Sequence, residues 1–141
     1  MALATRLHFK MVTPIATVFE QEVEGVSLPT VMGEITVLPE HTELVSVLTP
    51  GELVVRADGK TFPLAVTGGV VEVHNNTLYI LADAAEHVTD IDVVAAEKRA
   101  LQLEQDLKDR ADLDLTSYSL LQRNLEMERL KLNLTKKWRK Q

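Results

Sequence analysis

The first 85 residues alternate short apolar runs with turn residues, as strands do. The runs recur at about the 8–12-residue spacing of a β-sandwich or barrel, and no stretch among them has the 3.6-residue period of a helix. They cover residues 7–12, 15–18, 23–28, 35–38, 44–48, 53–56, 62–66, 70–73 and 78–81. Asp58-Gly59 and Asn75-Asn76 are typical of tight hairpin turns, because these residues tolerate positive φ. The pattern predicts an antiparallel all-β body.

A helical period replaces this alternation from Asp92 onward. Neither proline nor glycine occurs after residue 69. Apolar residues with the spacing of one helical stripe are Val93, Ala96, Ala100, Leu103 and Leu107. Asp90 or Asp92 can cap this helix, and after a short polar break Asp114 or Thr116 can cap a second helix that runs to about Trp138. Two helices joined by so short a loop are expected to lie antiparallel.

The second helix carries more apolar surface than one neighbour can cover. At about 100° per residue, two stripes form on different sides. One stripe comprises Leu120, Met127, Leu130, Leu134 and Trp138, and the other comprises Leu121, Leu125 and Leu132. Either the first helix and the β body take one stripe each, or one stripe is available to a different protein.

Composition and charge narrow the class of protein. The chain has 141 residues, 45% of them hydrophobic, and no cysteine, so disulfides and zinc–thiolate sites are excluded. No apolar run approaches the roughly 18 residues of a membrane span, and Arg6 and Lys10 interrupt any signal peptide. Residues 1–89 hold 4 basic and 11 acidic side chains, whereas residues 129–141 hold six basic side chains and no acid. An acidic body with a basic tip argues against nucleic-acid binding and favours an acidic protein partner.

Catalytic motifs are missing from the sequence. The four histidines lack metal-ligand spacing, and Gly68-Gly69 is followed by valines rather than by a phosphate-binding lysine. There is no G-x-S-x-G elbow and no pair of carboxylates in an apolar strand. We therefore expect neither an enzyme nor a metal site. The glycine pair more plausibly allows a close approach of strands.

Two segments resemble a known family. One is Gly33-Glu34-Ile35-Thr36-Val37-Leu38-Pro39-Glu40-His41, and the other is Val66-Thr67-Gly68-Gly69-Val70-Val71-Glu72-Val73. They are similar to the signature stretches of the epsilon subunit of the bacterial and chloroplast F-type ATP synthase. Their order, and the helical region that follows, extend the resemblance over essentially the whole chain.

The resemblance implies a sandwich of about ten strands followed by an antiparallel two-helix hairpin. It implies two domains: residues 1–87 would bind the gamma subunit and the c ring, and residues 88–141 would be regulatory. The protein would be a non-catalytic central-stalk subunit of a proton-translocating synthase, coupling c-ring rotation to the catalytic head. Its hairpin, when extended, would inhibit ATP hydrolysis. It would lie at the cytoplasmic face of the bacterial plasma membrane, as a peripheral protein held there through the complex.

The resemblance also implies roles for particular residues. Gly33 and Glu34 would contact the c ring, and Pro39 and His41 would contact gamma. Glu40 departs from the family, which usually has glycine or asparagine there. Basic side chains would meet the catalytic beta and alpha subunits when the hairpin extends. These are Arg129, Lys131, Lys136, Lys137, Arg139 and Lys140.

Some family members bind ATP near the start of the first helix. This chain keeps Glu86 and Asp92 of that pattern, but Ala95 stands where the arginine is expected, and Arg99 lies one turn later. Without a charge-assisted arginine contact, we expect no ATP binding, or only millimolar binding, and no cofactor. Two other functions fit the pattern without the resemblance: a soluble β-sandwich adaptor with a helical dimerisation hairpin, and an enzyme with an unrecognised site.

Overall fold

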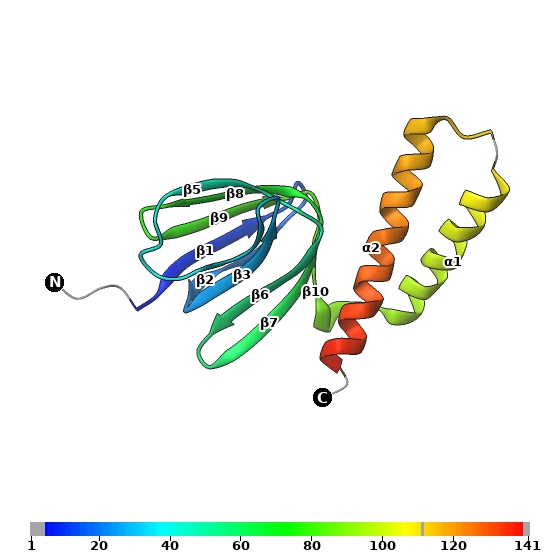
Figure 1. The fold of residues 1–141 in the computed structure, drawn as a ribbon. Coiled ribbons are helices and arrows are strands. Elements are labelled where there is room, and N and C mark those ends of the chain that lie inside the picture. Colours follow the sequence, from blue (N-terminus) through cyan, green and yellow to red (C-terminus); the bar gives the residue numbers. More distant parts are fainter. Residues whose placement is uncertain (1–4, 111, 140–141) are drawn as a thin grey trace. The chain divides into compact units, whose positions relative to one another are not determined.

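The computed structural model describes residues 5–110 and 112–139 (Figure 1). The chain divides into two compact units, residues 1–87 and 88–141, each with its own internal contacts. The first unit consists of strands and the second of helices.

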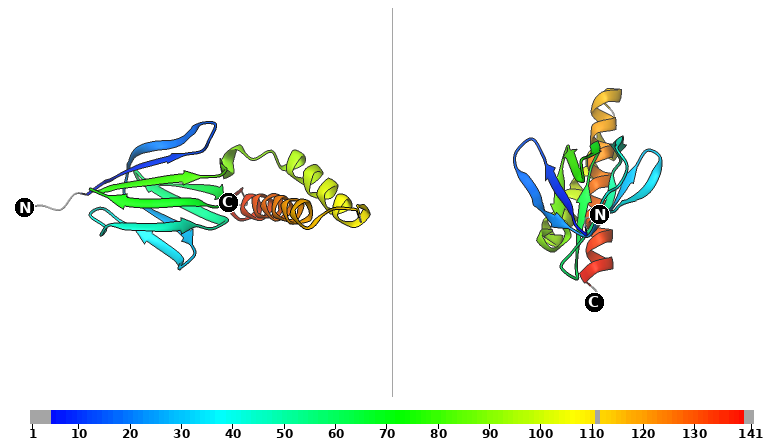
Figure 2. Two further views of the ribbon diagram at one scale, coloured as in Figure 1. Left: turned by 90° about the horizontal axis from the view of Figure 1, so that it is seen from above. Right: turned by 90° about the vertical axis from the view of Figure 1, so that its left-hand side faces the viewer.

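Ten strands make up the described part of the first unit, residues 5–87. They are β1 (Leu7–Val12), β2 (Thr17–Val23), β3 (Gly25–Thr30), β4 (Gly33–Val37), β5 (Leu44–Leu48), β6 (Gly51–Ala57), β7 (Lys60–Val66), β8 (Gly69–His74), β9 (Thr77–Ala82) and β10 (Ala85–His87). The strand order is β10-β7-β6-β3-β5-β8-β9-β1-β2, with β4 added to β3. In Figures 1 and 2 the strands fold over into facing layers, which confirms the predicted all-β sandwich.

The core of the sandwich lies between these layers. Alternate residues of β1, β6, β8 and β9 are buried, as a period of two requires. The ring of Phe19 lies 5.4 Å from that of Phe9 and 5.8 Å from that of Phe62, measured between centroids. Aromatic pairs at such distances add to the stability that apolar burial provides.

Three details of the sandwich differ from the sequence prediction. The second strand continues to Val23 through polar residues, where the apolar runs predicted an end at residue 18. The short strand β10 was not predicted by the pattern. The pairing is also not antiparallel throughout, because β1 and β9 run parallel.

The predicted tight turns are present. Asp58 and Gly59 have φ of 54° and 73°, and Asn75 and Asn76 have φ of 50° and 55°. Two consecutive residues with positive φ form the turn that matches the twist of a β-hairpin. These turns join β6 to β7 and β8 to β9.

The second unit begins with the 3₁₀ turn η1 (Val88–Asp90) and contains α1 (Val93–Asp109) and α2 (Leu115–Arg139). The Asp92 carboxylate accepts a hydrogen bond from the Ala95 amide at 3.1 Å, and the Asp114 carboxylate accepts one from the Ser117 amide at 2.8 Å. The helices run antiparallel (Figure 1), as the short connection predicted. Within the described ranges, neither helix is long and apolar enough to cross a membrane.

Candidate functional site

The turn between β3 and β4 displays two apolar side chains. Val31 is 60% exposed and Met32 is 85% exposed. Gly33 follows with φ of 104°, a conformation that glycine adopts without strain. The buried Thr30 holds the turn, because its hydroxyl donates to the Gly33 carbonyl at 2.7 Å and accepts from the Met32 amide at 3.2 Å. The predicted contact residues Gly33 and Glu34 are exposed beside this apolar pair, which the sequence reasoning did not single out.

A second turn contains the predicted gamma contacts Pro39 and His41, both half-buried. Glu40 between them has φ of 64°, a left-handed conformation that glycine adopts more easily. A residue far along the sequence holds this turn, because the Glu40 amide donates to Oδ1 of Asn76 at 2.8 Å. Nδ2 of Asn76 in turn donates to the Arg6 carbonyl at 2.8 Å, so one side chain joins three segments.

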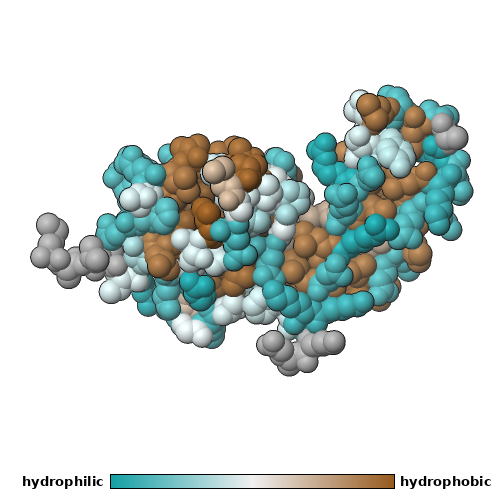
Figure 3. Space-filling model, viewed as in Figure 1, coloured by the Kyte–Doolittle hydropathy of each residue, from teal (hydrophilic) through white to brown (hydrophobic). Residues whose placement is uncertain are grey.

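An apolar strip crosses the outer face of β5, β8 and β9. Val47 is paired with Val70, and Val70 with Leu81, so the three side chains form one row. They are 50%, 48% and 46% exposed, and Val45 on the same face of β5 is 75% exposed. Figure 3 shows apolar side chains gathered over this part of the sandwich. The sequence signal was present, because these strands carry apolar residues on both faces instead of one.

The strip is continuous with the β3–β4 turn. The amide of Val31 donates to the carbonyl of Val47 at 3.0 Å, so the turn is attached to the end of the strip. At its other end β5 begins at Leu44, three residues after His41. One strand therefore connects the two predicted contact sites of the sandwich.

The basic residues of α2 are mostly engaged within the helical unit. Arg129 pairs with Glu104 at 3.0 Å, and Nζ of Lys131 lies 3.4 Å from Oε1 of Glu128. Nη2 of Arg139 donates to the carbonyls of Val88 and Ile91. Lys137 lies over the ring of Trp138, 5.5 Å from its centroid. Lys140 lies outside the described residues.

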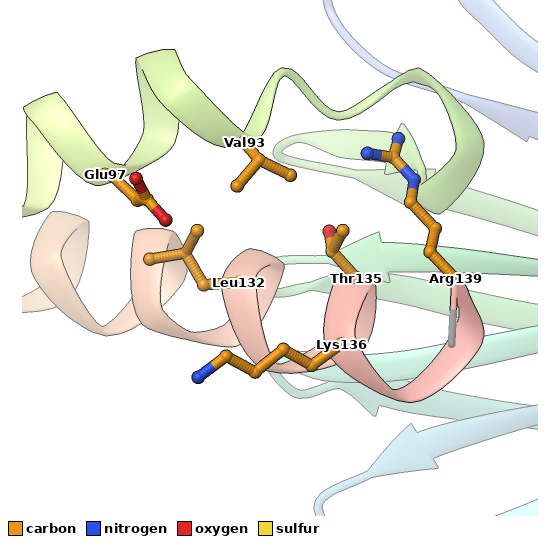
Figure 4. A pocket seen from close by; sticks show the side chains of 6 residues that line it. All are labelled: Val93, Glu97, Leu132, Thr135, Lys136 and Arg139. Carbon is orange, nitrogen blue, oxygen red and sulfur yellow. The ribbon is translucent and has the colours of Figure 1, made fainter.

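Arg139 and Lys136 border a shallow hollow between the start of α1 and the end of α2 (Figure 4). Val93, Glu97, Leu132 and Thr135 complete its lining. The Arg139 bonds to the carbonyls of Val88 and Ile91 measure 2.7 and 2.9 Å, so its guanidinium caps backbone instead of opening into the hollow.

The two residues predicted for a vestigial ATP site belong to different units of the structure. Glu86 lies on β10 in the first unit, whereas Asp92 caps α1 in the second. The Asp92 carboxylate is already used by the Ala95 amide. No group of three or more metal-ligating side chains gathers among the described residues.

Known proteins resemble this chain over both units. Residues 6–88 match the family model of the ATP synthase delta/epsilon chain, beta-sandwich domain. The ATP synthase epsilon chain of Nitratidesulfovibrio vulgaris (strain DP4) is 38% identical over 130 residues, covering 90% of this chain and 96% of the relative. The epsilon chain of Herpetosiphon aurantiacus is 42% identical over 104 residues, covering 74% and 76%. A chain in the mitochondrial ATP synthase structure of Euglena gracilis, in rotational state 1, superposes with a TM-score of 0.75 at 24% identity, covering 95% of this chain and 84% of that one.

Proposed function

Because the chain belongs to the ATP synthase epsilon chains, non-catalytic subunits of that complex, we propose that it couples c-ring rotation to the catalytic head and restrains ATP hydrolysis. The observation that carries this proposal is the match to an epsilon chain across 90% of the sequence, since it includes both the sandwich and the helices.

The sandwich supplies the surfaces for coupling. We propose that Gly33 and Glu34 contact the c ring, with Met32 adding an apolar contact from the same turn. The turn of Pro39 and His41 would contact gamma, and the apolar strip beside it would be covered by the same subunit. An exposed apolar strip on a soluble domain commonly marks a protein interface, which supports this assignment.

The helical unit supplies the inhibitory element. When extended, its basic side chains would meet acidic surface on the beta and alpha subunits. Single exposed ion pairs contribute about 0–1 kcal/mol, so several of these cations must act together to hold the inhibited state. The protein would act at the cytoplasmic face of the plasma membrane of a bacterium, held peripherally in a proton-translocating complex and without bound ATP.

The test is ATP hydrolysis by a reconstituted complex that contains either the full chain or a chain lacking residues 116–141. We expect the truncated chain to assemble with gamma and to raise hydrolysis. Replacing Lys136, Lys137 and Arg139 by glutamine should also weaken inhibition and its dependence on salt. Lys98→Gln and Lys108→Gln on α1 remove the same kind of charge and are the matched control. Unchanged hydrolysis after truncation would exclude the inhibitory role, and failure of the full chain to bind gamma would exclude the coupling role.

A further inference from the structure

A carboxylate is buried between the two helices with only one of its oxygens satisfied. The side chain of Glu128 on α2 is 10% exposed. Its Oε1 accepts a hydrogen bond from Nε of Arg99 on α1 at 2.9 Å, and Nζ of Lys131 lies 3.4 Å from the same oxygen. Its Oε2 is shielded and accepts no hydrogen bond from the described residues. Burying a charge costs free energy unless the charge is paired, so the two cations beside this carboxylate stabilise its charged form.

The two cations differ in their access to water. The Arg99 side chain is 52% exposed, whereas the Lys131 side chain is only 14% exposed. If the charge of Glu128 were removed, water could solvate the half-exposed Arg99 guanidinium. Lys131 lies three residues after Glu128 on the same helix, so the contact that joins the two helices is the one between Arg99 and Glu128.

Two further basic residues of α2 are held in the same closed arrangement. Arg129 pairs with Glu104 of α1 at 3.0 Å. Arg139 donates to the backbone carbonyls of Val88 and Ile91, which precede α1. The Arg129 contact and the Arg99–Glu128 pair join α2 to α1, and the Arg139 contacts join α2 to the segment before α1. Each of these contacts is lost if the helices separate.

We propose that Glu128 is the central contact of an internal latch that keeps the basic side chains of α2 away from the catalytic head. Closed helices engage Arg129 and Arg139 internally, and separated helices present them to an acidic partner. Separation also exposes Oε2 of Glu128 to water, which relieves its unsatisfied state and lowers the cost of opening. The proposal rests on the proposed inhibitory function and adds the contact that regulates it.

The test measures the distance between the helices in the full chain. Because the sequence contains no cysteine, Lys98→Cys and Asn133→Cys introduce one spin label on each helix without interference. Both positions are exposed. Glu128→Gln preserves shape but removes the charge, and a charge-assisted hydrogen bond is about twice as strong as a neutral one. We expect the separated population in the pulsed electron–electron resonance distance distribution to rise about three- to tenfold.

Glu126→Gln is the matched control, since Glu126 is an exposed acid of the same helix and its loss changes the net charge equally. Arg99→Gln is a second variant, because it removes the same ion pair from its half-exposed side. In a double-mutant cycle, the effect of Arg99→Gln should shrink once Glu128 is glutamine. Circular dichroism verifies that the helices persist in each variant.

Hydrolysis by the reconstituted complex separates this proposal from the one on which it rests. More separated helices together with stronger inhibition in Glu128→Gln supports both. More separated helices with unchanged hydrolysis supports the latch and excludes inhibition by the hairpin. A distance distribution that matches the Glu126→Gln control, or independent effects of Arg99→Gln and Glu128→Gln, overturns the latch.

Discussion

Gly69 offers a sharp test of how closely the strands of the sandwich approach. It is the first residue of β8 and pairs with Leu48 on β5 and with Ala82 on β9. A Cβ at this position would lie 2.8 Å from Cα of Ala82 and still closer to the carbonyl oxygen of Leu81. Both are backbone atoms, so no side-chain rotation can relieve the collision. We expect Gly69→Ala to push β8 away from β9.

The size of the effect follows from two contributions. Overpacking a well-packed interior costs about 1–3 kcal/mol. Displacing the end of the strand weakens one or two ladder hydrogen bonds, at about 1 kcal/mol each. Alanine also restricts the unfolded chain more than glycine does, which raises the free energy of unfolding by about 0.4–1 kcal/mol. The net loss in free energy of unfolding is therefore about 2–3 kcal/mol, which lowers the melting temperature of a unit this size by roughly 10–20 °C.

The neighbouring glycine provides the control. A Cβ at Gly68 would lie 3.4 Å from the carbonyl oxygen of Leu48 and 3.5 Å from Oδ2 of Asp83, which are ordinary contacts. Gly68→Ala should therefore change the free energy of unfolding by less than about 0.5 kcal/mol. Urea titrations of the full chain, followed through the amide signals of β8 and β9, report on the sandwich alone. Equal losses in the two variants, or no loss in Gly69→Ala, would refute the steric account.

Other predictions concern the turns and the helix cap. Asn76→Gly keeps the turn at φ 55° but removes both side-chain hydrogen bonds, so the Glu40 amide should exchange with solvent at least several-fold faster, whereas Asn75→Gly should leave that rate unchanged. Glu40→Gly should raise the free energy of unfolding by about 1 kcal/mol in urea titrations, because it relieves a left-handed φ of 64°. Hydrogen bonds from the Ser117 side chain and amide lower the pKa of Asp114, so the cap stabilises α2 above the unfolded pKa and is lost as pH falls through the folded one. Asp114→Asn should keep the cap at neutral pH and remove this acid dependence of helicity, as measured by circular dichroism.

The sequence predicts those strands of the sandwich whose residues alternate between buried and exposed. It does not predict strand segments that depend on the residues paired with them on a neighbouring strand. Strand β2 continues through Glu20 and Glu22, which an apolar period cannot detect. Their partners lie on β1: Glu22 contacts His8 at 3.0 Å, and Glu20 lies 3.8 Å from Nζ of Lys10. Polar residues thus continue a strand where polar partners stand opposite them on β1, and that register exists only once the chain has folded.

The helix caps were predictable for a different reason. Capping is a local interaction, and Asp92 and Asp114 each bond to an amide three residues ahead. The prediction that one apolar stripe of α2 faces α1 agrees with the structure, since Leu125 and Leu132 lie beside residues of α1. Met127 of the other stripe also lies beside residues of α1, and what covers the rest of that stripe stays a prediction.

The sequence located two turns of the candidate site but not the surface between them. The signature stretches located the two turns of the sandwich, yet the apolar strip emerges only when the pairing of β5, β8 and β9 places Val47, Val70 and Leu81 in one row. The partners of Arg139 are backbone carbonyls 48 and 51 residues away. Every residue has a backbone carbonyl, so the sequence does not indicate which ones an arginine will bind. Distant polar contacts of this kind are visible only in the structure.

The two units hold their proposed contact residues in different ways, and this difference suits the proposed division of labour. In the sandwich, a continuous hydrogen-bonded strand, β5, links the β3–β4 turn to the turn of Pro39 and His41. Deforming that path would break ladder hydrogen bonds and disturb a close-packed core, so a force applied at one turn should reach the other with little loss. The basic side chains of α2 are instead held by a few ion pairs and carbonyl contacts, and exposed pairs contribute only about 0–1 kcal/mol each. An acidic partner surface that offers comparable pairs can therefore compete for them, which is what a reversible inhibitor requires and what a rigid coupling element must avoid.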